Sequence, residues 1–342
     1  MKEKPAGLLL IDKSRGPTSH DVVGAVRRLL RTREVGHTGT LDPFATGVLP
    51  LALGGATRLI QFLDESIKVY DATIRLGCAT DTGDPTGKVI RAAPVPSLDA
   101  DQILKVLATF EGDRMQTPPA YSAVKHKGRR LYEYARQGEE IEVAARPITI
   151  HGLRLVAFDA TPASTSPEIG ADPPADGPTV RVEITCTRGT YARVLADEIA
   201  TALGTAGHLA ALCRTRSGPF YLCDALGLPQ LAAFACDAPE HSWVTVLLER
   251  SRERRVKWQP RDAVRASVTP FVRSTLDALA GLPIVDLRPH EAHRVRAGGP
   301  PPPAPPSVQE GRRCLLVAGD QLVAIAERTA TGTKVLKVMD AS

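Results

Sequence analysis

Residues 298–306 read GGPPPPAPP, a run that neither a helix nor a central strand can contain. Proline has no backbone N–H and its ring fixes φ, so consecutive prolines stay extended without internal hydrogen bonds. The run therefore divides the chain. We expect a large domain over residues 1–250, a connecting segment over 251–300 and a small domain over 301–342.

A second break lies inside the large domain. Residues 159–178 are rich in proline, alanine and acidic residues and contain almost no large apolar side chains. Such a composition favours a surface loop over a packed element. The sequence therefore predicts a mobile loop inserted at about 159–178.

The segment after the polyproline run has the pattern of short strands. Gly319-Asp320 is a two-residue hairpin signal between two apolar runs, Cys314 to Val317 and Leu322 to Ile325. Residues 334–339 are a third candidate strand. The small domain is therefore expected to be rich in β-structure.

The large domain mixes two periodicities. Residues 179–187 alternate strictly between apolar and polar side chains, which is typical of a strand with one wet face in an antiparallel or mixed sheet. Residues 69–76 alternate as well and place Tyr70 on the apolar face. Helical spacing recurs at 20–32 after Thr18 or Ser19, at 101–110 after Asp99, at 191–203 before Gly204, and at 223–248. These patterns predict the α+β class, with a curved, mostly antiparallel sheet and flanking helices.

Composition sets outer limits on the function. Among the 342 residues 43% are hydrophobic, enough for one large core and a small satellite domain, and 24% are charged, as in ordinary globular proteins. The formal net charge of +5 suits a polyanionic partner, although many proteins without such a partner share it. The six cysteines form no C-x-x-C pair, so we expect free thiols and no zinc site. No apolar run approaches 18 residues and no signal peptide is evident, so we expect a cytoplasmic chain without a membrane span.

The segment GHTGTLDPFATGVL, residues 36–49, has no clear period and carries one carboxylate, Asp42. Pro43 restricts Asp42 toward an extended backbone, and Gly39 and Gly47 permit close approach by backbone or ligand. A rigid loop with one acid beside hydroxyl groups could present a nucleophile. An ordinary Asp-Pro turn with helix caps would use the same residue types.

This segment resembles the catalytic loop of the TruB family of pseudouridine synthases. Further blocks in the family's order extend the resemblance over about residues 8–220: IDKSRGPTS at 11–19, GGATR at 54–58, KVY at 68–70, LG at 76–77, TDTGD at 80–84 with Gly87, QTPPAYSAVK at 116–125, GTYAR at 189–193 and LCRTRSG at 212–218. Ser14, Arg58 and Ala192 depart from the residues usual in the family. The resemblance implies a pseudouridine-synthase fold followed by a small PUA-like β domain.

The resemblance also implies the chemistry. It makes Asp42 the catalytic carboxylate that frees the base of a uridine so that it rejoins through carbon, without metal, nucleotide or redox cofactor. An aspartate is ionised near pH 7 unless burial raises its pKa, and a neighbouring arginine would keep it charged. In the family this partner corresponds to Arg193. Tyr70 would stack on the uracil and help to move a proton, with core packing as its simpler role.

The implied substrate is the T-stem-loop of tRNA, with uridine 55 extruded from the stack before reaction. By the same resemblance, substrate contacts are expected from His37, Tyr191, Leu212, Lys13 and Thr40. Basic side chains expected to hold the RNA backbone are Arg15, Lys125, Lys127, Arg129 and Arg130. For Leu212 core packing is the alternative role, and residues 125–130 could be a solvated helix or loop face.

Three alternatives differ in class. A guide-RNA-dependent synthase like dyskerin shares the catalytic blocks but works with accessory subunits and carries a longer tail. A tRNA-binding folding helper would have catalysis as a secondary role. Glycoside hydrolysis needs a second working carboxylate about 5–10 Å away, and Asp81 and Asp84 look more like turn residues. We therefore expect a monomeric enzyme that acts on tRNA without an obligate protein partner.

Overall fold

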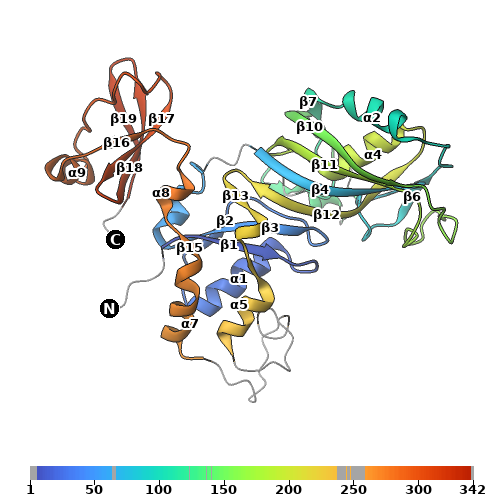
Figure 1. The fold of residues 1–342 in the computed structure, drawn as a ribbon, viewed down its shortest axis with the longest axis horizontal. Coiled ribbons are helices and arrows are strands. Elements are labelled where there is room, and N and C mark those ends of the chain that lie inside the picture. Colours follow the sequence, from blue (N-terminus) through green and yellow to red (C-terminus); the bar gives the residue numbers. More distant parts are fainter. Residues whose placement is uncertain are drawn as a thin grey trace.

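The computed structural model describes residues 6–63, 67–122, 124–135, 137–139, 141–236, 244, 247 and 259–339. An eleven-stranded sheet forms the large part of the molecule, and a four-stranded sheet forms the C-terminal part (Figure 1). Helices pack beside both sheets. The predicted α+β class with a small β-rich C-terminal domain is confirmed.

The large sheet is mixed and mostly antiparallel. Its main path runs in the order β14 (Leu226–Gly227), β1 (Gly7–Lys13), β3 (Thr46–Leu53), β12 (Gly207–Ser217), β4 (Ile67–Leu76), β11 (Thr179–Thr187), β10 (Arg146–Asp159) and β7 (Gly112–Gln116). Three short strands pair with strands of this path: β2 (Val35–His37) pairs with β3, β13 (Phe220–Tyr221) with β12, and β15 (Val272–Arg273) with β1. Along the main path only β1–β14 and β3–β12 are parallel.

The alternating strands lie where the periodicity places them. In β11 the residues Val180, Val182 and Ile184 are buried, while their neighbours along the strand are more exposed. The antiparallel partner β4 buries Ala72 and Ile74. These side chains belong to one continuous apolar cluster under the large sheet.

The predicted helix caps are present. Helix α1 (Ser19–Leu30) begins after Thr18, which forms a capping box with Asp21. Helix α2 (Ala100–Ala108) begins after Asp99, which forms one with Gln102.

Other helices complete the two ends of the large sheet. Helix α4 (Ala192–Ala202) ends just before Gly204, whose φ is +83°. Helix α5 (Leu228–Ala235) begins later than the helix expected over 223–248, because the 3₁₀ turn η2 (Leu222–Asp224) and strand β14 occupy the expected start. Most of the expected helix beyond residue 236 lies outside the described residues. Figure 1 shows α1, α5 and α7 (Arg261–Val268) beside β1 and β3, and α2 and α4 beside β4, β11 and β10.

The insertion at 159–178 contains no helix or strand between the end of β10 and the start of β11, and hydrogen bonds attach it to neighbouring segments. Its backbone forms two hydrogen bonds with Val89, the first residue of β6 (Val89–Ala92). The Gly170 N–H donates to the Val89 carbonyl, and the Val89 N–H donates to the Ala171 carbonyl. Arg75 of β4 donates to the carbonyl of Pro174 at 2.9 Å. Backbone hydrogen bonds, which composition does not reveal, dock this segment on the sheet.

The C-terminal sheet has the order β16 (Ile284–Asp286), β17 (Arg313–Ala318), β18 (Gln321–Thr329) and β19 (Gly332–Val338). The predicted hairpin is confirmed, since Ala318 pairs with Gln321 around Gly319, whose φ is +63°. Residues 251–300 are more than the connection that was expected. They contribute β15 to the large sheet, and both β16 and α9 (Pro289–Arg296) to the C-terminal part.

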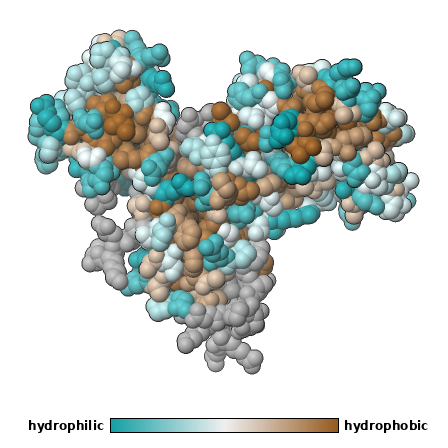
Figure 2. Space-filling view, in the orientation of Figure 1, coloured by the Kyte–Doolittle hydropathy of each residue, from teal (hydrophilic) through white to brown (hydrophobic). Residues whose placement is uncertain are grey.

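The C-terminal domain packs against the large sheet through β17. Leu315 and Val317 join a cluster with Leu8 and Leu10 of β1, together with η1 (Gly54–Leu59) and α8 (Thr275–Ala278). Residues one step along the strand, Cys314 and Leu316, face the interior of the C-terminal domain. Figure 2 shows hydrophobic residues gathered on the C-terminal domain and near β7 and β10 on this side of the molecule. Within the described ranges no helix is long and apolar enough to cross a membrane.

Candidate active site

Asp42 lies in the turn that connects β2 to β3. The turn is closed by a hydrogen bond from the Ala45 N–H to the Asp42 carbonyl at 3.1 Å. Just before it, Leu41 is fixed to the start of α1. The Ser19 hydroxyl accepts from the Leu41 N–H at 2.8 Å and donates to the Leu41 carbonyl at 3.1 Å. The loop is therefore anchored directly beside the carboxylate.

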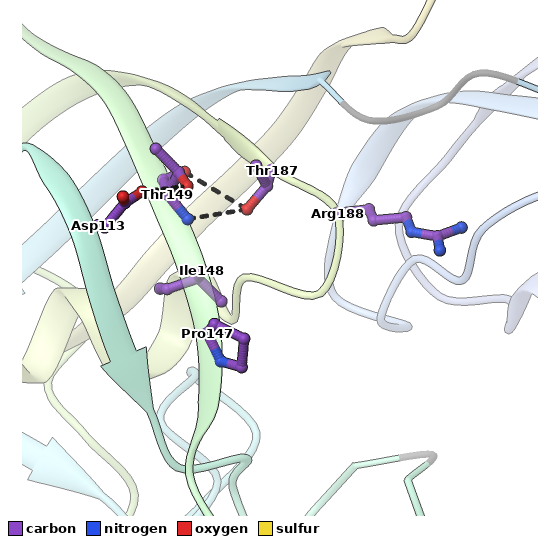
Figure 3. Close-up of a pocket in the computed structure, with 6 residues that line it drawn as sticks. All are labelled: Asp113, Pro147, Ile148, Thr149, Thr187 and Arg188. Atoms are coloured by element: carbon purple, nitrogen blue, oxygen red, sulfur yellow. Dashed lines mark hydrogen bonds between the residues drawn. The ribbon is translucent and has the colours of Figure 1, made fainter. Parts of the chain in front are cut away.

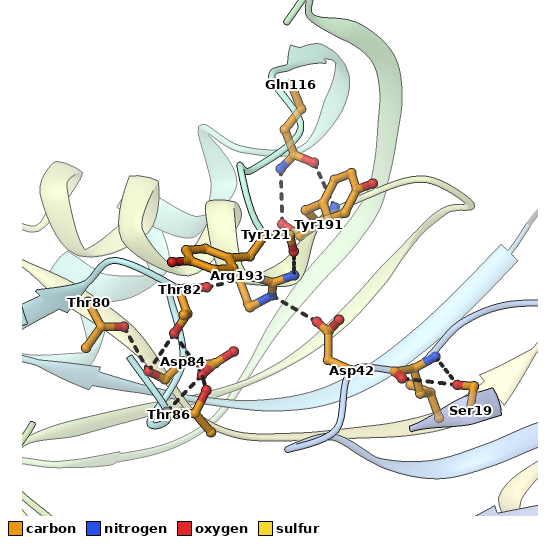
Figure 4. Close-up of polar contacts among 11 residues, drawn as sticks. Ser19, Asp42, Thr80, Thr82, Asp84, Thr86, Gln116, Tyr121, Tyr191 and Arg193 are labelled. Carbon is orange, nitrogen blue, oxygen red and sulfur yellow. Dashed lines mark hydrogen bonds and ion pairs between the residues drawn. The ribbon is translucent and has the colours of Figure 1, made fainter. Parts of the chain in front are cut away.

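Arg193, in the first turn of α4, holds the Asp42 carboxylate through an ion pair. Its Nε lies 2.9 Å from Asp42 Oδ2, and the exposed fractions of the two side chains are 5% and 35%. The two remaining nitrogens donate to the carbonyls of Thr82 at 2.7 Å and Tyr121 at 2.8 Å. Figure 4 shows the guanidinium between Asp42 and these two backbone groups. Each of the three guanidinium nitrogens of this buried side chain thus donates a hydrogen bond, and part of the carboxylate stays open to solvent.

The turn after β5 (Cys78–Thr80) shapes the far side of Arg193. The Asp84 carboxylate accepts hydrogen bonds from the hydroxyls of Thr82 and Thr86, and the Thr80 hydroxyl donates to the Asp84 carbonyl at 2.8 Å. Gly83 has a φ of +72°, and a Cβ there would lie 3.1 Å from the Arg193 Cβ. Asp84 is therefore a turn residue, as the sequence indicates.

Asp81 has a comparable role in the same turn, because its carboxylate accepts from the Lys88 N–H at 2.8 Å. Gln116, at the end of β7, holds the residue before α4. Its side-chain amide accepts from the Tyr191 N–H at 2.7 Å and donates to the Tyr191 carbonyl at 3.2 Å. Tyr191 thus lies at the start of α4, two residues from Arg193, with its backbone fixed (Figure 4).

Tyr70 lies on β4 and packs against the main apolar cluster. Burial raises the pKa of its phenol, and the neighbouring Arg214 lowers it in part. The phenol therefore keeps its proton at neutral pH, as a proton donor must. Leu212 of β12 is buried in the same cluster, 7% exposed.

Lys13 differs from the substrate contact that the resemblance implies. Its side chain is fully buried, and Nζ donates to the carbonyls of Ser14 at 3.0 Å, Pro43 at 3.3 Å and Ala45 at 2.7 Å. Burial lowers its pKa to about 8, opposed in part by Asp42. Lys13 therefore fixes the backbone of the Asp42 loop from the protein interior. Because its side chain has no exposed surface, it cannot contact an RNA in this arrangement.

The remaining predicted residues lie around the loop or on a hairpin. His37 ends β2 opposite Leu51 of β3 and is half-buried, while Thr40 and Arg15 are exposed. His37 and Thr40 precede Asp42 by five and two residues in the chain. Arg15 is brought to the same region by its neighbour Gly16, whose N–H donates to the Pro43 carbonyl at 2.8 Å.

Residues 125–130 form a hairpin of β8 (Lys125–His126) and β9 (Arg129–Arg130), in place of the expected helix or loop face. Lys127 and Gly128 at its tip have φ values of +48° and +86°. Arg129 lies over the Tyr134 ring of α3 (Leu131–Ala135) at 4.2 Å, and Arg130 lies 5.9 Å from the Tyr132 ring. The side chain of Lys125 lies outside the described residues.

A cavity of about 500 Å³ lies elsewhere, between β7, β10 and the residues after β11 (Figure 3). It is lined by Asp113, Pro147, Ile148, Thr149, Thr187 and Arg188. Thr149 bonds to both Asp113 and Thr187, and the Arg188 side chain extends away from the strands. None of the predicted site residues lines it. In the described part of the chain no group of three or more His, Cys, Asp and Glu residues is placed to hold a metal ion.

Three contributors to the site were not singled out from the sequence: Ser19, Gln116 and Arg214. Each lies in a block that carries the family resemblance, which was the available signal. Their roles depend on contacts to backbone groups that are 22, 75 and more than 160 residues away in the chain. No local pattern reports such contacts.

Comparisons with known proteins identify the family of the chain. The family model described as "TruB family pseudouridylate synthase (N terminal domain)" matches residues 27–192. A protein of Geobacter sulfurreducens named tRNA pseudouridine synthase B is 37% identical over 330 residues, which cover 95% of this chain and 94% of that protein. A protein of the same name from Aromatoleum aromaticum is 46% identical over 232 residues, or 68% of this chain and 70% of that protein.

Among solved structures, the chain is similar to one in the crystal structure of a Cbf5-Nop10-Gar1 complex. The TM-score is 0.65 at 25% sequence identity, and the match covers 98% of this chain and 85% of that one. The likeness thus includes the C-terminal domain as well as the large sheet.

Proposed function

Because the chain belongs to the TruB family of pseudouridylate synthases, we propose that it converts uridine 55 in the T-loop of tRNA to pseudouridine. The ion pair between Asp42 and Arg193 carries this proposal. It combines a carboxylate that is about one-third exposed with a cation that is almost fully buried. The charge-assisted hydrogen bond from the buried arginine holds the carboxylate in one orientation, while its exposed part remains reachable by a substrate.

The reaction breaks the bond between N1 of uracil and C1′ of ribose and forms one between C5 and C1′. The proton on C5 is lost to solvent, and N1 regains one. Asp42 acts at the sugar, either by attack on C1′ or by assisting elimination to a glycal, and both routes need one ionised oxygen at that position. Tyr70 supports the turning base with its ring and moves a proton with its hydroxyl.

The substrate follows from the relatives and from the surface around the loop. The relatives are named tRNA pseudouridine synthase B, and a uridine must leave its stack before Asp42 can reach the sugar. Arg15 and the exposed tip of the β8–β9 hairpin supply positive charge for phosphates. His37, Thr40, Tyr191 and Leu212 are proposed to contact the extruded nucleotides.

We further propose that the chain acts in the cytoplasm as a monomer without an obligate protein partner. Two alternatives make different demands. If the protein were a guide-RNA-dependent synthase, the purified chain alone would leave a tRNA transcript unmodified. If the protein were a tRNA folding helper, catalytically active and inactive forms of the chain would bind tRNA and help it to fold equally well.

The test uses purified chain and tRNA transcript with tritium at C5 of uracil. The unmodified chain should release tritium from one uridine of the T-loop. Asp42→Asn should abolish release, because the amide cannot act as the anionic nucleophile, while the Kd for tRNA stays within about threefold.

Asp71→Asn is the matched control. Asp71 also forms an ion pair with an arginine, Arg181, and its side chain is 29% exposed, but it lies on the other face of β4. Exposed pairs of this kind contribute only about 0–1 kcal/mol, so this variant should keep full activity. Full turnover by Asp42→Asn, or no release by the unmodified chain, would refute the proposal.

A further inference from the structure

Arg214 of β12 is a fully buried cation that the reaction scheme above does not use. It is 1% exposed, and it is among the largest side chains with almost no contact with solvent. Its Nε donates to the Val48 carbonyl at 2.9 Å, and its two terminal nitrogens donate to Thr40 and Gly39, each at 3.2 Å. These three carbonyls lie on both sides of Asp42 in the chain. One side chain therefore ties together the two ends of the loop that carries the carboxylate.

The backbone of Arg214 also lies between the two other parts of the site. It pairs with Gly47 in the parallel ladder of β12 and β3, and with Tyr70 in the antiparallel ladder of β12 and β4. The contact with Gly47 is close, since a Cβ on Gly47 would lie 2.3 Å from the Arg214 carbonyl oxygen. The Arg214 charge also lowers the pKa of the Tyr70 phenol, against the larger effect of burial, so the guanidinium lies near that side chain.

Lys13 completes the support of the loop from another strand. It binds the carbonyls of Pro43 and Ala45, whereas Arg214 binds those of Gly39, Thr40 and Val48. Neither cation bonds to the Asp42 carboxylate, which is held by Arg193. Orientation of the loop backbone and pairing of the carboxylate are thus assigned to different cations.

We propose that Arg214 is a positioning residue for the pseudouridylation reaction: it fixes the loop over 39–48 so that Asp42 faces Arg193, and its backbone holds Tyr70 on the strand beside that loop. This inference rests on the proposed function. It assigns Arg214 to the chemical step, because the residue is buried and cannot contact RNA in this arrangement.

A lysine cannot reproduce this arrangement. Arginine offers five N–H groups in a planar fork and reaches three carbonyls with fixed geometry, whereas an ammonium is a point donor on a flexible stem. Arg214→Lys therefore keeps the charge and most of the volume but loses the three-point hold. Arg214→Met removes the charge as well.

The experiment measures kcat and KM for tritium release from tRNA transcript by wild type, Arg214→Lys and Arg214→Met, with circular dichroism to check the fold. A displacement of about 1 Å in a reacting group can cost about 100-fold in rate. We expect kcat to fall about 100-fold in both variants, with KM within about threefold of wild type. Arg265→Lys is the matched control, because Arg265 is also buried and bonds a backbone carbonyl, that of Leu30 at 3.0 Å, far from the loop. Its kcat should stay at the wild-type value.

A second measurement tests the link to Tyr70. If Arg214 acts partly through the tyrosine, Arg214→Lys should cost less in a Tyr70→Phe background than in wild type, as residual single-turnover rates report. Equal losses in both backgrounds would limit Arg214 to the loop and overturn the tyrosine part of the inference.

Folded variants with wild-type kcat, or with a raised KM and an unchanged kcat, would overturn the whole inference. So would failure of both variants to fold, since Arg214 would then serve the fold alone. Failure of the proposed function is recognised separately, because the wild-type chain would then release no tritium from tRNA.

Discussion

Buried cations determine how the Asp42 carboxylate is presented. Removing an ion pair from water is costly, and the cost is offset only where additional hydrogen bonds satisfy the partners. Arg193 meets this condition through the carbonyls of Thr82 and Tyr121. Because Asp42 keeps 35% of its side chain exposed, the carboxylate stays both paired and reachable.

Lys13, which is buried beside the same loop, makes the stability of the protein depend on pH. Burial lowers its pKa from 10.5 to about 8. Between these values the unfolded chain still binds the proton that the folded chain has lost, so the free energy of unfolding rises with pH across this window. A shift of this size corresponds to roughly 3–4 kcal/mol.

Urea unfolding at about pH 7.5, 9 and 10.5 covers the two ends and the middle of this window. The free energy of unfolding should depend on pH differently in wild type and in Lys13→Met. The wild type should gain stability relative to the variant as the pH rises. Lys105→Met, which removes an exposed lysine of α2, is the control and should follow the wild-type pH dependence. A constant difference between wild type and Lys13→Met would contradict a buried, proton-releasing lysine.

At the scale of elements, the parallel contact between β3 and β12 depends on a glycine. Gly47 has a φ of +107°, and an added Cβ would meet the Arg214 backbone at 2.3 Å. Gly77 has nearly the same φ, +106°, but there a Cβ would meet only Val95 Cγ2 at 3.6 Å. Gly77→Ala thus isolates the strain of positive φ, about 1–2 kcal/mol.

Gly47→Ala should cost about 2 kcal/mol more than Gly77→Ala, because the two strands must also separate. Urea denaturation gives both values. The Gly47 variant should in addition lose activity, since Arg214 moves together with the loop. Equal stability of the two variants would show that β3 and β12 can separate without cost.

Elements with a local signal could be predicted from the sequence, and those defined by distant contacts could not. The capping boxes at Thr18 and Asp99 and the hairpin at Gly319 each depend on residues within a few positions of one another. The docking of 159–178 depends on Val89 and Arg75, which are far away in the chain. The site follows the same division, since the ordered blocks identify Asp42 while Arg214 becomes visible only through the carbonyls that it binds.

On the scale of the whole molecule, β17 divides its apolar residues between two cores. Leu315 packs against β1 and η1, and Leu316 packs inside the C-terminal domain. Both are fully buried, so their truncation to alanine is expected to cost about 2–5 kcal/mol. The two variants should nevertheless loosen different parts of the protein.

Hydrogen exchange followed by mass spectrometry can distinguish them. Leu315→Ala should speed exchange in β1, because the cluster that covers Leu8 and Leu10 is opened. Leu316→Ala should speed exchange mainly in β17 and β18. The same exchange in β1 for both variants would mean that the C-terminal domain does not stabilise the large sheet.

The shared cluster has a geometric consequence. The strand β17 packs on β1, and β1 pairs with β3, which follows directly from the Asp42 loop. The small sheet is therefore held at a fixed separation from the Asp42 carboxylate. An RNA that touches both places must bridge that separation with a stem of matching length. The protein would then discriminate among RNAs by dimension as well as by the identity of their bases.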